Sequence, residues 1–201
     1  MFLLFIKCKY LCALFAILNI IVKILISQQE YLSHRRFKYD ALERAYYNFL
    51  SMHHLIPMPN INKVAYNDYD CLILTGGPDS IARNNTENIL FNHALQKGVP
   101  IIGICHGAFA INDIAGGANG QIDGHVDKDI EIELEGRSYS VKCYHSQSVE
   151  RLADDYEVTA TDIDGTIEAF QHVTKSIYGI VWHPERMEEP VLPSAVRKIL
   201  F

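Results

Sequence analysis

Two short apolar runs constrain the fold more than any other feature of this chain. Segments 70–74 and 99–104 lack the alternation of polar and apolar side chains that marks a strand with one face in water. Each run ends in a glycine-containing turn, and a helical pattern follows each turn. Strands that are buried on both faces and connected through helices form parallel sheets. We therefore predict an α/β domain with a mostly parallel central sheet and helices on both faces.

Hydrophobic periodicity predicts the remaining elements. Apolar residues at helical spacing predict a helix from Ser33 to His54, and Asn85 or Thr86 can cap a second helix that ends before Gly98. The second half is rich in strands, and Asp164-Gly165 is a hairpin signal that indicates antiparallel pairing. The further predicted strands are 23–27, 55–60, 130–134, 138–145, 156–162, 166–171 and 177–182, and the further predicted helices are 105–115 and 194–200.

Composition excludes several classes of protein. Apolar residues make up 49% and charged residues 21% of the 201 residues, which is typical of one globular domain with its own core. The net charge of −6 and the lack of a basic stripe argue against a nucleic-acid partner. The nine histidines show no metal-ligand spacing, so we expect neither a metal nor another cofactor. The five irregularly spaced cysteines are predicted to be free thiols of a reducing compartment, the cytoplasm.

The N-terminal segment 1–21 does not fit the domain pattern. Its uninterrupted apolar run is short for a membrane span, and no A-x-A cleavage site follows it. Because the strand predicted at 23–27 begins directly afterwards, we interpret 1–21 as an over-long start, with a signal or anchor as the alternative. The folded domain is then expected at 22–201, and a membrane partner is not expected.

Cys105 lies in a sequence suited to a reactive thiol. Gly103-Ile104-Cys105-His106-Gly107 is a G-x-C-x-G motif between a predicted strand and a predicted helix. Glycines on both sides permit the sharp turn that exposes the sulfur, and the following helix N-terminus favours a thiolate. The backbone N–H of His106 is then placed to stabilise an oxyanion. A buried cysteine in an ordinary turn is the alternative.

Two other segments favour the catalytic interpretation. His183 and Glu185 end a predicted strand, where residues two apart project to the same side. His183 can therefore face Cys105 while Glu185 holds its other ring nitrogen, as in a nucleophile–base–carboxylate triad. Gly76-Gly77-Pro78 follows another strand, and the N–H of Gly77 is the candidate for a second oxyanion donor.

Together these segments resemble the class I glutamine amidotransferases, over residues 23 to about 190. The resemblance rests on five motifs in family order: LILTGGPDS at 72–80, VPIIGICHG at 99–107, YHSQSV at 144–149, DGTIEAF at 164–170 and GIVWHPE at 179–185. It implies a flavodoxin-like α/β fold, with Cys105 as nucleophile, His183 as base and then acid, and Glu185 as its orienting carboxylate. It further implies an oxyanion hole at Gly77 and His106. The implied substrate-binding residues are Gly76, Phe109, Tyr144, His145 and Ser146. His145 is alternatively a second catalytic base.

The chain departs from the family at the nucleophile turn, which usually reads C-x-G-x-Q. Phe109 stands where that glutamine helps to hold the glutamyl group, which puts free glutamine as substrate in doubt; Phe109 is alternatively core packing. The segments 40–44 and 55–60 resemble stand-alone γ-glutamyl hydrolases of capsule phosphoramidate synthesis, which act on a γ-glutamyl-cytidine-diphosphate amidate.

Three functions therefore stay open. The favoured one is hydrolysis of a γ-glutamyl nucleotide amidate, with His34, Arg35 and Arg36 as candidate phosphate contacts or simply as solvated charges. The second is a glutaminase that supplies ammonia to a separate synthetase subunit. The third is a non-catalytic binding module, against which the retention of Cys105, His183 and Glu185 argues.

Overall fold

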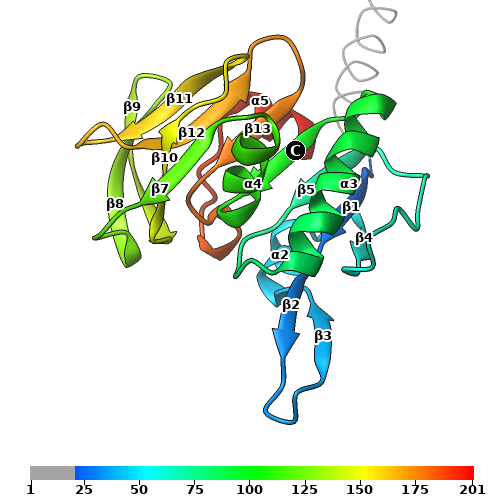
Figure 1. Cartoon of the computed structure of the whole chain (residues 1–201). Coiled ribbons are helices and arrows are strands. Elements are labelled where there is room, and N and C mark those ends of the chain that lie inside the picture. The colour runs from blue at the N-terminus through cyan, green and yellow to red at the C-terminus, as the bar shows by residue number, and fades with distance from the viewer. Residues whose placement is uncertain (1–20) are drawn as a thin grey trace, which may run out of the picture.

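The computed structural model describes residues 21–201, and Figure 1 shows their arrangement. Residues 1–20 lie outside the described part, and with them nearly all of the segment interpreted as an over-long start. The strands of the main sheet are β1 (Lys23–Ser27), β4 (His54–Met58), β5 (Cys71–Leu74), β6 (Ile101–Ile104), β8 (Val126–Leu134), β9 (Arg137–Tyr144), β11 (Tyr156–Asp162), β12 (Ile167–His172) and β13 (Ile177–Ile180). The helices are α2 (Arg44–Phe49), α3 (Ile81–Lys97), α4 (His106–Ile114) and α5 (Ser194–Leu200), with a short 3-10 turn, η1, at Pro184–Arg186.

The main sheet has nine strands in the order β4-β1-β5-β6-β13-β12-β11-β8-β9. From β4 to β13 all neighbours are parallel. From β13 to β9 all neighbours are antiparallel. The predicted fold class, a mostly parallel sheet with an antiparallel second half, is therefore confirmed.

Helices cover both faces of the parallel half, because each strand alternates its side chains between them. Ile24 and Ile26 of β1 pack into the core that holds Tyr46 of α2 and Val196 of α5. Leu25 points the other way, into the core built with Leu90 and Phe91 of α3 and Ala108 of α4. None of the helices in residues 21–201 is long and apolar enough to cross a bilayer.

The antiparallel end of the sheet curls back on itself. The backbone N–H of His183, just after β13, donates to the carbonyl of Lys142 in β9 at 3.0 Å. In the sheet order three other strands separate β13 from β9. This contact therefore closes the five strands into a partial barrel, whose interior lies beside the end of β13.

The predicted helix from Ser33 to His54 is wrong over its first part. Residues 29–41 form a hairpin of β2 (Gln29–Leu32) and β3 (Lys38–Ala41), and only Arg44–Phe49 is helical. The apolar residues that suggested a helix include Phe37, which is exposed, as is Tyr39 beside it. The turn contains no glycine, proline or asparagine to mark it, and Arg36 adopts the left-handed conformation there (φ 63°).

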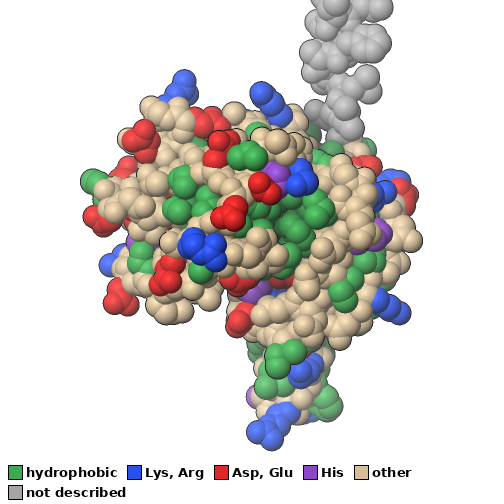
Figure 2. Space-filling view, turned by 45° about the horizontal axis from the view of Figure 1, so that its top comes forward, with side chains coloured by type: hydrophobic (Ala, Val, Ile, Leu, Met, Phe, Trp, Pro, Cys, Tyr) green, Lys and Arg blue, Asp and Glu red, His purple; other side chains and the backbone are tan. Residues whose placement is uncertain are grey.

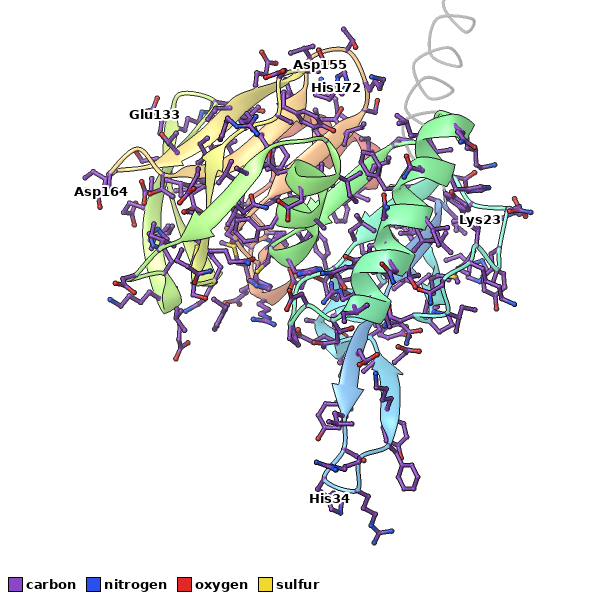
Figure 3. All side chains as sticks on the ribbon, in the orientation of Figure 1. Lys23, His34, Glu133, Asp155, Asp164 and His172 are labelled. Carbon is purple, nitrogen blue, oxygen red and sulfur yellow. The ribbon has the colours of Figure 1, made fainter. Side chains whose placement is uncertain are left out.

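The hairpin projects from the carboxyl edge of the parallel sheet, because β2 continues directly from β1 (Figure 1). His34 lies at its tip, at the opposite end of the molecule from Asp155 and His172 (Figure 3). Hydrophobic and basic side chains are mixed over its surface (Figure 2).

Two smaller differences concern the elements around the site. Helix α3 begins at Ile81 rather than at residue 85 or 86, because Ser80 is its N-cap and accepts a hydrogen bond from the N–H of Arg83 at 3.2 Å. The strands β7 (Ala118–Gln121) and β10 (Gln147–Arg151), which the sequence analysis did not predict, pair as a separate antiparallel ribbon.

Candidate active site

Cys105 occupies a strained turn between β6 and α4. Its φ of 50° and ψ of −107° are a combination that residues with a Cβ atom rarely adopt. The flanking glycines are required by close packing. A Cβ atom on Gly103 would overlap the carbonyl of Gly107, and one on Gly107 would overlap the carbonyl of Leu74. The predicted sharp turn is therefore present, and it holds the thiol at the carboxyl edge of the parallel sheet.

His183 and Glu185 meet Cys105 at this edge. The Nδ1 atom of His183 lies 2.6 Å from Oε1 of Glu185. Cys105 lies beside the imidazole, since both side chains border the Cβ position of Gly76. Because Nδ1 is engaged by Glu185, Nε2 is the ring nitrogen left for the sulfur. A Cβ atom on Gly76 would come within 2.6 Å of Cε1 of His183, so only glycine leaves room for the imidazole here. The three side chains thus form a row of sulfur, imidazole and carboxylate.

The surroundings of His183 favour its protonated form. Burial lowers the pKa of His183, but the hydrogen bonds to Cys105 and Glu185 and the negative charges of both outweigh burial and raise the pKa to about 9. At neutral pH the imidazole therefore carries a proton beside the sulfur. A protonated histidine that contacts a cysteine is suited to hold a thiolate and then to donate a proton.

Both predicted oxyanion residues lie at the cavity on which Cys105 opens. His106 begins α4, where a backbone N–H has no acceptor within its own helix. Gly77 has a φ of 115°, which only glycine adopts without strain. The N–H of the preceding residue, Gly76, donates instead to the hydroxyl of Tyr46 at 2.9 Å. Gly77 therefore remains the candidate from this loop.

The cavity has a volume of about 400 Å³. Four of the five predicted substrate-binding residues line it: Phe109, Tyr144, His145 and Ser146. Gly76 does not; it lies against His183 and Cys105 instead. Phe109 is both a wall of the cavity and almost fully buried, so its packing role and its contact with the cavity coexist.

Comparison with known proteins identifies the family. Residues 33–201 match the family described as glutamine amidotransferase class-I. The chain belongs to this family. Among solved structures, a glutamine amidotransferase from Thermotoga maritima superposes with a TM-score of 0.65 at 16% identity, covering 82% of this chain and 76% of that one.

Two relatives of this amidotransferase chain differ in the reaction for which they are named. A subunit of the glutamine-hydrolysing GMP synthase of Methanosphaera stadtmanae is 33% identical over 59% of this chain and 67% of its own length. The γ-glutamyl-CDP-amidate hydrolase of Campylobacter jejuni is 29% identical over 65% of this chain and 71% of its own. In other relatives the match spans less than half of the relative's length, down to 24%. Hydrolysis of an amide C–N bond is the reaction type common to both names.

A buried ionic cluster, missed by the sequence analysis, supports the loop that carries Gly77. We call it the arginine cluster; its members are Ser27, Thr75, Arg83, Glu87 and His106. The guanidinium of Arg83 donates to Oε1 of Glu87 at 2.9 Å and to the carbonyls of Thr75 and Pro78. The other carboxylate oxygen of Glu87 lies 3.0 Å from Nε2 of His106. The loop with Gly77 is therefore fastened to the helix that follows the thiol.

The arginine cluster is electrostatically balanced. Burial raises the pKa of Glu87, but the hydrogen bond from His106 and the charge of Arg83 outweigh burial, so that the pKa lies below its usual value. No local motif distinguishes Arg83 from a solvated arginine, although its place one turn before Glu87 is a weak signal for a helical ion pair.

Arg186 and Tyr144 form a second feature that the sequence analysis did not foresee. The Arg186 guanidinium lies 4.6 Å from the centre of the Tyr144 ring and pairs with Glu43 at 2.8 and 3.1 Å. The Tyr144 ring in turn meets the His183 ring edge-on, with their centres 5.4 Å apart. The bidentate pair therefore holds one wall of the cavity against the imidazole.

Proposed function

We propose that this chain hydrolyses a γ-glutamyl amide, with Cys105 as nucleophile, His183 as acid and base, and Glu185 as the carboxylate that orients it. One observation carries the proposal: the row of sulfur, imidazole and carboxylate opens onto a polar cavity of about 400 Å³. A nucleophile, a base and an orienting group in contact are the parts that covalent amide hydrolysis needs.

The proposed reaction has two stages. The Cys105 thiolate attacks the γ-carbonyl carbon, and the N–H groups of Gly77 and His106 hold the resulting oxyanion. His183 gives its proton to the leaving nitrogen as the C–N bond breaks, which leaves a γ-glutamyl thioester. The neutral imidazole then takes a proton from water, which attacks the thioester. The C–S bond breaks, glutamate is released, and the Cys105 thiolate is restored beside the protonated His183.

For the substrate we favour a γ-glutamyl nucleotide amidate, as in capsule modification, over free glutamine. Its support is the Campylobacter jejuni relative and the replacement of the family's glutamine by Phe109. A further support is the hairpin with His34, Arg35 and Arg36 (Figure 1). It follows β1 as Cys105 follows β6, and these strands run parallel, so both lie at the same edge of the sheet. Cationic side chains on that hairpin can attract the phosphates of a large leaving group.

The second candidate is a glutaminase that passes ammonia to a partner synthetase. The relatives named as one subunit of a glutamine-hydrolysing GMP synthase favour it. So does the exposed hairpin, because Tyr31, Leu32, Phe37 and Tyr39 offer apolar surface that a protein partner can cover.

A substrate comparison tests the proposal. Purified protein is offered glutamine and, separately, γ-glutamyl-CDP-amidate, and released glutamate is measured. We expect turnover of the amidate to exceed that of glutamine by at least about tenfold, which corresponds to about 1.4 kcal/mol in the transition state. Rapid glutamine hydrolysis with no amidate turnover would support the glutaminase instead.

Thiol labelling tests the catalytic row independently of the substrate. Iodoacetamide is expected to label Cys105 at neutral pH, and a His183→Gln variant is expected to label more slowly because it lacks the imidazolium. Cys71 is the internal control, since burial raises the pKa of its thiol to about 12. Equal labelling rates for Cys105 in both proteins, with no turnover of either substrate, would leave only the non-catalytic module.

A further inference from the structure

A second buried polar cluster lies inside the partial barrel, beside the cavity. We call it the histidine cluster; its members are His125, Cys143, His145, Asp162 and Glu168. All five residues are buried, and Cys143 and Glu168 are fully inaccessible to solvent. They come from β9, β11, β12 and the segments that precede β8 and follow β9, which the curl of the sheet brings together. His145 connects the cluster to the substrate cavity, which it also lines.

The hydrogen bonds of His145 determine which of its ring nitrogens carries a lone pair. Nδ1 lies 2.8 Å from the carbonyl oxygen of Gln147, which can only accept, so Nδ1 must carry a proton. In the neutral ring Nε2 then has a free lone pair, and it is buried without any hydrogen-bond partner. A histidine held in this way, with the outer nitrogen bonded to a carbonyl and the inner one free, has the arrangement typical of a metal ligand.

The free nitrogen of His145 faces a carboxylate. Its Nε2 atom lies 3.6 Å from Oε2 of Glu168, and the same oxygen lies 3.9 Å from the sulfur of Cys143. The other carboxylate oxygen of Glu168, Oε1, is also buried and without a hydrogen-bond partner. A lone pair opposite a buried carboxylate is repulsive unless a proton or a cation lies between them.

We propose that Cys143, His145 and Glu168 bind a divalent metal ion of the zinc class. Their ligand atoms lie within 4.8 Å of one another, which leaves room for a central ion at the usual bond lengths of about 2.0–2.3 Å. Thiolate, imidazole and carboxylate are the ligand types that zinc accepts together. One thiolate and one carboxylate also balance the two positive charges, so no net charge is buried.

His125 and Asp162 complete the surroundings of the metal. Nε2 of His125 lies 3.0 Å from Oδ2 of Asp162 and 3.6 Å from Oε1 of Glu168. Asp162 is further held by the N–H groups of Asp164 and Thr166. His125 is therefore placed either to orient Glu168 or, by releasing Asp162, to provide the fourth ligand.

The burial of the cluster indicates a structural rather than a catalytic metal. All three proposed ligands are almost fully enclosed, and catalytic zinc sites keep an open position for water or substrate. Burial and the charge of Glu168 raise the pKa of the Cys143 thiol, so metal binding must displace its proton to solvent. The metal would link Cys143 of β9 to Glu168 of β12 and hold His145, so it would fix the wall of the cavity formed by His145 and Ser146.

Metal binding is tested in a background that carries Cys8→Ser, Cys12→Ser and Cys105→Ser, so that Cys71 and Cys143 are the remaining thiols. The purified full-length protein is incubated with Zn²⁺ or Co²⁺, passed through a desalting column and analysed for metal by mass spectrometry. We expect one equivalent to be retained, and we expect Co²⁺ to give a thiolate-to-cobalt charge-transfer band. Adding Cys143→Ser should abolish the band and weaken binding by more than about tenfold. Adding the matched substitution Cys71→Ser, in a buried strand away from the cluster, should change neither.

A second measurement keeps the proposal testable if the Cys143 variant folds poorly. A strong chelator should lower the midpoint of thermal unfolding of this background protein and leave that of the same protein with His145→Gln unchanged. Less than a tenth of an equivalent of retained metal, or a cobalt band that survives Cys143→Ser, would overturn the proposal. Both readouts are independent of substrate turnover, so they do not depend on the proposed function.

Discussion

The cavity beside Cys105 lies between two buried polar clusters that differ in how completely their groups are paired. In the arginine cluster each carboxylate oxygen of Glu87 has a partner, and Arg83 reaches four acceptors. In the histidine cluster, Nε2 of His145 and Oε1 of Glu168 have none. A buried charge is tolerated when its partners are supplied by the fold. The first cluster is therefore paired within the protein, and the second has the unpaired groups on which the proposed metal site rests.

The largest expected effect comes from breaking the complete cluster. Arg83→Met leaves the carboxylate of Glu87 buried without its cation, which we expect to lower the free energy of unfolding by about 3–5 kcal/mol. The loop that carries Gly77 also loses two carbonyl contacts, so activity should fall with stability. Urea denaturation measures the first effect. The exposed Arg44→Met is the matched control and should change stability by less than about 0.5 kcal/mol.

A double substitution separates lost pairing from lost packing. Arg83→Met with Glu87→Leu removes the orphaned charge, and we expect it to be less destabilised than Arg83→Met alone. The loss of unfolding free energy in the double variant is compared with the sum of the losses in the two single variants. If the two values were equal, the interpretation of an electrostatically balanced cluster would be wrong.

Replacing the central glutamate of each cluster by glutamine should give the next largest difference in the free energy of unfolding. Glu87→Gln should lower the free energy of unfolding by about 1.5–3 kcal/mol, because it weakens bonds to charged donors. In chelator-treated protein Glu168→Gln should be close to neutral, because the new amide can donate to the free nitrogen of His145. Equal losses in urea denaturation would show that the two carboxylates are equally well paired, and would remove the contrast on which the comparison depends.

The contrast between the clusters also shows what sequence reasoning can and cannot find. Cys105, His183 and Glu185 were selected because a glycine-flanked turn and a strand end each carry a local signal. Arg83 and Glu168 carry no such signal, since their meaning depends on which strands and helices meet in space. The catalytic roles remain predictions; the structure adds the contact between His183 and Glu185 and the position of Cys105 beside them.

The fold shows the same division between local and distant information. The buried runs of β5 and β6 were predicted because burial on both faces leaves a continuous apolar pattern. The hairpin at 29–41 was missed because aromatic residues on a projecting ribbon imitate the spacing of an amphipathic helix. A helical register cannot distinguish apolar residues that face a core from those that face solvent.

The protonation of His183, which lies between Cys105 and Glu185, determines how we expect activity to depend on pH. His183 is more basic in the folded protein, at about 9, than in an unfolded chain, at about 6.5. Its stabilising contribution is therefore complete below about pH 6.5 and is lost as the pH rises through about 9. The proton for the leaving nitrogen is lost over the same range, so kcat/KM should fall about tenfold per pH unit above pH 9.

The pH profile also sharpens the comparison. The groups that raise the pKa of His183 are Cys105 and Glu185, and neither belongs to a cluster. The fall of kcat/KM at high pH should therefore begin at the same pH in the Glu168→Gln variant as in the unchanged protein. A shift of that pH by one unit or more would mean that the histidine cluster acts electrostatically on the row, beyond any effect on the shape of the cavity.

The smallest expected effect concerns Tyr46 of α2, which supports the loop of Gly76 and Gly77 beside His183. Its hydroxyl accepts the N–H of Gly76, and burial and the charge of Glu185 raise the pKa of Tyr46 well above its usual value, so the hydroxyl stays neutral. Tyr46→Phe leaves that N–H without an acceptor, which should lower the free energy of unfolding by about 1 kcal/mol. We also expect kcat to fall several-fold with little change in KM, because the loop that orients Gly77 loses an anchor while the cavity walls remain. The exposed neighbouring Tyr47→Phe should alter neither quantity, and a Tyr46→Phe enzyme with unchanged kcat would mean that the arginine cluster alone holds the loop.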